Sequence, residues 1–83
     1  MKERGNAFSP EEEECQKEIE ELARRREECE QQIRKLREQE KPALGITFHK
    51  EIHTLLQEKL RLSVNLRIYR NKIAQLHAGR TLH

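Results

Sequence analysis

Residues 41–45 read KPALG, and this short stretch decides how the 83-residue chain folds. Pro42 has no backbone N–H to donate, and its ring disfavours helical geometry at the preceding Lys41. Gly45 adds backbone freedom shortly afterwards. Long segments with helical periodicity lie on both sides of this stretch. We therefore expect the chain to kink or turn over residues 41–46.

The segment before the break begins with a clear helix-start signal. Ser9 can accept a hydrogen bond from the first turn, Pro10 suits the first helical position, and Glu12 completes a capping box. The acidic residues that follow complement the positive end of the helix dipole. We predict a flexible lead-in over residues 1–8 and an acidic heptad helix over residues 9–40.

Apolar residues recur at alternating four- and three-residue spacing in both segments, which is the heptad pattern of a coiled coil. The second segment is a basic heptad helix over residues 47–78, with Gly79 as its expected end and residues 79–83 as a tail. The pattern predicts an all-α fold of long, dimeric coiled-coil helices. The predicted dimer seam consists of Ile19, Leu22, Cys29, Ile33, Leu36, Ile52, Leu55, Leu62, Leu66, Tyr69 and Ile73.

Two charged residues, Arg26 and Lys59, occupy seam positions. Charged seam residues lower stability but restrict register and oligomeric state, and their stems can pack while their heads reach water. Cys15 and Cys29 occupy equivalent seam positions two heptads apart. We expect these cysteines to act as small apolar residues.

The two halves of the chain carry opposite charge. Residues 1–40 hold nine basic and 13 acidic residues, a net of −4, whereas residues 41–83 hold eight basic and two acidic residues, a net of +6. Two geometries fit the heptads. One is a parallel dimer kinked near Pro42, and the other is an antiparallel hairpin, which the opposite charges favour.

The second helix has an apolar row beside its seam, made of Leu56, Leu60, Val64 and Ile68. A helix that is apolar on two sides normally contacts more than one partner. We expect this row to recruit another dimer or a different coiled-coil protein. A basic face is predicted at Lys59, Arg61, Arg67, Arg70 and Lys72, and such a face more often pairs with acidic helices than with nucleic acid.

The stretch 55–70 reads LLQEKLRLSVNLRIYR and resembles the C-terminal end of the intermediate filament rod, coil 2B. The resemblance is carried by a Leu-Leu pair, a following Lys, alternating aliphatic residues and the pair Tyr69-Arg70. It implies a rod segment that dimerises. Asn65 replaces an acidic residue of the family pattern, and Pro42 is foreign to an ordinary coil 2B. The chain is therefore similar to a divergent or orphan member, for which the resemblance implies a cytoskeletal or nuclear scaffold location.

The sequence lacks the motifs of several other classes of protein. No nucleophile–base set, phosphate loop or concave apolar pocket can be read from the sequence, so we expect neither an enzyme nor a cofactor site. His49 and His53 are four residues apart, but no obvious third metal ligand accompanies them. No apolar run approaches the length of a membrane span, and no signal pattern is present. An intracellular, non-secreted protein is expected.

These observations lead to a main hypothesis and two alternatives. The main hypothesis is a structural coiled-coil segment that forms a homodimer or a tetramer and takes part in filament or scaffold assembly. The first alternative is an adaptor helix or helical hairpin that docks onto another coiled-coil or acidic helical protein in a nuclear scaffold. The weaker alternative is a small nucleic-acid binder.

Overall fold

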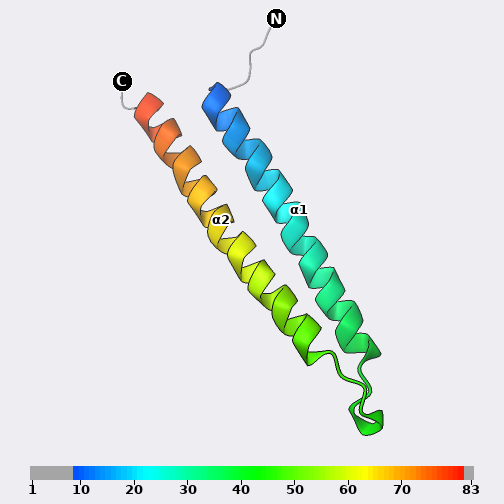
Figure 1. Ribbon diagram of the computed structural model, residues 1–83. Coiled ribbons are helices and arrows are strands. Elements are labelled where there is room, and N and C mark those ends of the chain that lie inside the picture. Colours follow the sequence, from blue (N-terminus) through cyan, green and yellow to red (C-terminus); the bar gives the residue numbers. More distant parts are fainter. Residues whose placement is uncertain (1–8, 82–83) are drawn as a thin grey trace, which may run out of the picture.

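The structure is a computed structural model that describes residues 9–81, with side chains over residues 9–79. Helix α1 spans Pro10–Gln39, a single 3-10 turn η1 spans Pro42–Leu44, and helix α2 spans His49–Thr81. The chain reverses at η1, so that α2 packs antiparallel along α1 (Figure 1). Of the two geometries that fit the heptads, the structure has the hairpin.

The start of α1 has the predicted capping box. The Glu12 backbone N–H donates to Ser9 Oγ at 3.2 Å, and the Ser9 N–H donates back to Glu12 Oε1 at 2.8 Å. Pro10 occupies the first helical position, where no N–H is needed. The Glu12 side chain is fully buried, and its Oε2 lies 3.6 Å from His77 Nδ1 of α2. The open end of the hairpin is therefore tied by a polar contact between the two helices.

The reversal is built from short backbone hydrogen bonds. Lys41 has a non-helical backbone, as expected for a residue before proline, and its N–H and carbonyl pair with Ile46 at 2.8 and 3.1 Å. Gly45 ends the 3-10 turn in the left-handed region at φ 75°, which glycine tolerates best. The Phe48 N–H then donates to Glu40 Oε2 at 3.0 Å, linking the two helix ends. The predicted break over 41–46 is thus a closed turn.

The core is a single strip along the interface of the two helices. Leu22, Cys29, Leu62 and Leu66 form its centre, and Leu66 has no exposed surface. Each fully buried leucine of this kind contributes about 1.5–3 kcal/mol of transfer free energy. All predicted seam residues are buried or half-buried; beyond the centre, these are Ile19, Ile33, Leu36, Ile52, Leu55, Tyr69 and Ile73.

Some predicted boundaries differ from the observed ones. Gly79 does not end the second helix, because α2 continues through it to Thr81 with ordinary helical geometry. A helical glycine costs only about 0.5–1 kcal/mol, so it does not by itself stop a helix. The helix also begins at His49 rather than at residue 47, since Thr47 and Phe48 still belong to the connection. The predicted lead-in over residues 1–8 lies outside the described residues.

Candidate interaction face

The seam predicted for a dimer is filled within one chain. When the seam residues are assigned to heptad positions a and d, apolar side chains of α1 pack against apolar side chains of α2 at the centre of the hairpin. The structure brings together Leu22 and Cys29 of α1 with Leu62 and Leu66 of α2. A dimer built on the same residues would require the two helices of each chain to separate.

The two charged seam residues find polar partners on the facing helix. Arg26 donates from its guanidinium to Ser63 Oγ at 3.3 Å, and Lys59 Nζ lies 3.1 Å from Glu30 Oε2. The Lys59 side chain keeps 37% of its surface exposed, so its stem packs while its head reaches water. Both contacts span the helices, and they oppose a sliding of α2 along α1.

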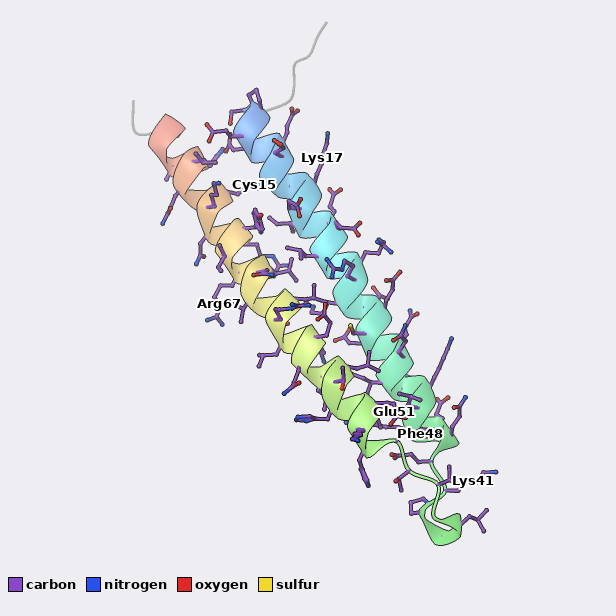
Figure 2. All side chains as sticks on the ribbon, in the orientation of Figure 1. Cys15, Lys17, Lys41, Phe48, Glu51 and Arg67 are labelled. Atoms are coloured by element: carbon purple, nitrogen blue, oxygen red, sulfur yellow. The ribbon has the colours of Figure 1, made fainter. Side chains whose placement is uncertain are left out.

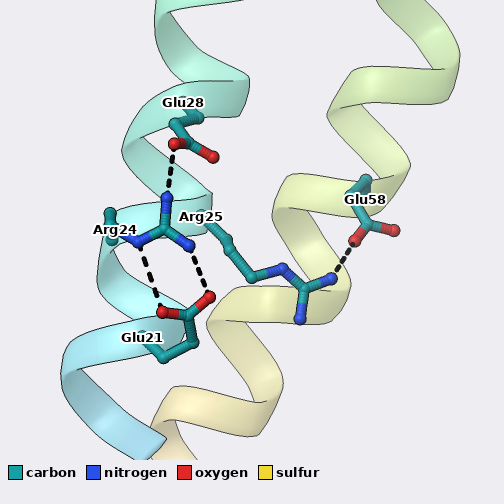
Figure 3. Close-up of polar contacts among 5 residues, drawn as sticks. All are labelled: Glu21, Arg24, Arg25, Glu28 and Glu58. Carbon is teal, nitrogen blue, oxygen red and sulfur yellow. Dashed lines mark hydrogen bonds and ion pairs between the residues drawn. The ribbon is translucent and has the colours of Figure 1, made fainter.

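A second pair across the helices joins Arg25 of α1 to Glu58 of α2. The Arg25 guanidinium donates to Glu58 Oε2 at 3.3 Å (Figure 3). Glu58 also pairs with Arg61 on its own helix. Sequence inspection did not identify this pair. The heptad positions could have identified it, because Arg25 and Glu58 both occupy position g, and g positions face each other in antiparallel coiled coils.

The apolar row predicted beside the seam lies exposed on α2. Leu56, Leu60, Val64 and Ile68 expose 41, 66, 50 and 55% of their surface. We call these four residues the outer row. They occupy heptad positions e, b, f and c, and the last three of these point away from the partner helix in any two-helix coil. Within residues 9–79, all four stay exposed beside the packed seam.

The outward face of α1 is entirely polar by contrast. Its b, c and f positions between residues 17 and 38 carry only Lys, Arg, Glu and Gln, all of them exposed. Arg24 binds two carboxylates there, Glu21 at 2.5 Å and Glu28 at 2.6 Å (Figure 3). The hydrogen bond from Arg24 holds the pKa of Glu21 below its ordinary value, and the same bond raises the pKa of Arg24. This face stabilises α1 along its own surface.

The five predicted basic residues do not share one side of α2. Lys59 lies in the seam, and Lys72 lines a groove with Glu14 and Glu18 of α1. Arg61 and Arg67 are the outward members, at positions c and b. Arg67 projects from the side of α2 that faces away from α1 (Figure 2).

Leu56 joins the outer row to the edge of the helix interface. An open groove of about 520 Å³ runs between the helices there. Its lining includes Ile33 and Arg37 of α1 together with Leu56 and Lys59 of α2. The outer row therefore extends from this groove across the back of α2.

The remaining candidate residues are placed as follows. His49 and His53 are both exposed on the first turns of α2, and residues 9–81 contain no group of three His, Cys, Asp or Glu side chains arranged to hold a metal ion. Cys15 and Cys29 are free thiols, 4 and 8% exposed, that pack in the seam as small apolar residues.

Neither described helix has an apolar window that meets the length and hydropathy needed to cross a bilayer. Searches against protein-family models, curated proteins and solved structures found no match to this chain.

Proposed function

We propose that this chain is a helical-hairpin adaptor that binds other helices through the outer row of α2. The observation that carries this proposal is the separation of two apolar surfaces on one helix. The seam side of α2 packs against α1, whereas Leu60, Val64 and Ile68 lie at outward positions and are at least half exposed. An interaction module needs a rigid support and a free apolar surface, and α2 supplies both.

The spacing of the outer row supports a binding role over chance exposure. Single exposed apolar residues are ordinary on protein surfaces, but contiguous apolar patches mark interaction sites. The outer row spans 13 residues of continuous helix, or about 18 Å along the axis. An exposed apolar face of this length is a docking groove or ridge for a second helix.

The dimeric structural role predicted from the heptads remains a second possibility with less support. It needs the seam, and the seam is already occupied by the contacts between α1 and α2. Nucleic-acid binding has weaker support still, because the basic residues are distributed around α2 and Lys59 is paired with Glu30. Sedimentation, run alongside the binding experiment below, would reveal a dimer of the unmodified chain.

The test is binding of a synthetic amphipathic helical peptide to the full chain, followed by fluorescence anisotropy. The peptide carries four leucines at i, i+4, i+8 and i+12 with neutral glutamine flanks. We expect saturable binding that Leu60→Asp reduces by about tenfold or more, since an aspartate there removes one leucine contact and desolvates a charge. Gln31→Asp, on the outward face of α1, is the matched control and should bind as the unmodified chain does.

Two results would contradict the proposal. Loss of binding in both variants would show that the peptide senses charge or overall stability and not the outer row. Equal binding of the unmodified chain and Leu60→Asp would show that the peptide contacts another surface. Sedimentation at several chain concentrations, run alongside, shows whether the unmodified hairpin is monomeric when it binds.

A further inference from the structure

We infer that the helix bound by the outer row is an acidic amphipathic helix that crosses α2 obliquely and does not coil around it. This inference depends on the proposed docking function, and it adds the charge and the crossing geometry of the partner. Two independent features of α2 support it. One is the uniform spacing of the outer row, and the other is the charge that borders it.

The outer row advances by four residues at every step, with no three-residue step. A row of this kind is inclined about 26° to the helix axis, whereas a coiled-coil seam alternates steps of three and four to stay parallel to a partner. When i+4 ridges of two helices interdigitate, the axes cross at about 50°. The seam of α2 therefore suits the near-parallel α1, and the outer row suits a partner lying across α2.

The charges beside the outer row are basic. Arg61 and Arg67 are three residues before and after Val64, so they border the row on opposite sides. Arg61 also pairs with Glu58 on its own helix, and its side chain stays 68% exposed to a partner. Arg67 projects away from α1 (Figure 2), and no ion pair involves it within the described part of the chain. The sequence contains no acidic residue after Glu58. A partner that carries Glu or Asp beside its apolar row would meet complementary charge at both borders.

A second copy of this chain does not provide such a surface. Its α2 would bring an apolar row, but with the same arginines, and like charges would face each other across the contact. Its α1 would bring acidic residues on an outward face without a single apolar side chain between residues 17 and 38. The required combination of apolar row and acidic borders must come from a different helix.

An anionic membrane surface would complement the positive charge of Arg61 and Arg67, but it would not match the twisted arrangement of the outer row. A helix lying on a membrane presents an apolar stripe parallel to its axis, so that all apolar residues reach the same depth. The outer row turns about 40° around the axis at each step, because four residues of 100° each exceed one full turn by that amount. Leu56 and Ile68 therefore point about 120° apart, which suits the groove of a crossing helix better than a flat surface.

The test measures the binding of synthetic peptides to the unmodified chain. Each peptide has about 21 residues, which is long enough for a helix to form. Three peptides share the i+4 leucine row and differ only in border residues, which are Glu, Gln or Lys. A fourth peptide contains the same residues as the Glu peptide, but its leucines follow heptad a and d spacing. Anisotropy titrations at low and high salt give the affinities.

We expect the Glu peptide to bind about tenfold or more tighter than the Lys peptide at low salt, with the difference shrinking as salt screens the charges. Arg61→Gln combined with Arg67→Gln should remove most of this preference and leave the binding of the Gln peptide unchanged. The heptad peptide should bind more weakly than its i+4 isomer. Leu60→Asp should weaken all four.

Failure of the inference is distinguishable from failure of the docking function. If no peptide binds, the docking function itself is wrong. If peptides bind through Leu60 without regard to border charge, or if the heptad isomer binds best, the function stands and the acidic crossing partner is wrong. Leu60-dependent binding to vesicles of phosphatidylserine and phosphatidylcholine, tighter than to the Glu peptide, would replace the helix with a membrane surface. Sedimentation that shows self-association lost in Leu60→Asp would replace it with a second copy.

Discussion

The outward faces of α1 and α2 differ, although both helices use the same heptad pattern to pack against each other. On α1 every outward position between residues 17 and 38 is polar, and side chains such as Arg24 and Glu21 bind one another along the helix surface. On α2 the corresponding positions include Leu60, Val64 and Ile68, all at least half exposed. The seam residues pack the two helices together without the outward faces. Under the proposed docking function, the difference between the outward faces reflects the binding of a partner by α2.

The most severe test of this contrast compares two leucines on α2. Leu66→Asp would place a charge in the closed interface, and we expect it to cost about 4 kcal/mol or more, enough to unfold so small a hairpin. Leu60→Asp should change the free energy of unfolding by less than about 1 kcal/mol, because Leu60 is 66% exposed. Urea unfolding followed by circular dichroism measures both. Similar destabilisation by the two variants would mean that the outer row is packed within the folded chain.

Removing an ion pair should change the free energy of unfolding less than Leu66→Asp does, and a pair between the helices should matter more than a pair on the outward face. Removal of Glu58, through Glu58→Gln, should lower the free energy of unfolding by about 0.5–1 kcal/mol, since Glu58 is only 27% exposed and binds Arg25 across the helices. Glu28→Gln, which removes a pair within α1, should cost about 0.3–0.5 kcal/mol.

Sensitivity to salt also distinguishes the ion pair between the two helices from the ion pair within α1. Half a molar sodium chloride should screen the exposed Arg24–Glu28 pair more completely than the Arg25–Glu58 pair. A double-mutant cycle on Arg25 and Glu58 isolates their coupling. A coupling of zero would indicate that this pair does not help to hold the register of the hairpin.

The smallest expected effect concerns the polar surface of α1. Arg24→Gln should raise the pKa of Glu21 towards its ordinary value of 4.5, because the hydrogen bond from Arg24 lowers it. A lowered folded pKa gives stability that is present above the unfolded pKa and lost as the pH falls through the folded pKa. The unmodified chain should therefore lose this contribution only below pH 4.5. Carboxyl titration by NMR measures the shift, and an unchanged Glu21 pKa in Arg24→Gln would contradict the pairing.

Much of the hairpin follows from local signals in the sequence. The capping box at Ser9 and Glu12, the break at Pro42 and the burial of the seam are each set by neighbouring residues and heptad spacing. The exposure of Leu60 and Val64 also follows, since two apolar faces cannot both pack against one helix. These features are local or periodic, and such features can be predicted from one sequence.

The direction of the chain after Pro42 was not predictable in the same way. Heptads give each helix an apolar side but do not say whether the facing helix belongs to the same chain. In the structure the facing helix belongs to the same chain, and contacts that the heptad pattern does not predict close the turn, such as the hydrogen bond from the Phe48 N–H to Glu40. The placement of Lys59 shows a similar limit. It was grouped with the basic face by its charge, whereas its seam position and Glu30 decide where it lies.

The central claim is that the seam is closed within one chain, which leaves the outer row free for a partner. Methyl NOEs test it most directly, recorded on fully ¹³C-labelled chain and on an equal mixture of labelled and unlabelled chains. We predict NOEs between Leu22 and Leu66 in the labelled sample and no isotope-filtered NOE between chains in the mixture. A filtered Leu22–Leu66 NOE in the mixture would contradict the hairpin and favour a dimer built on the same seam.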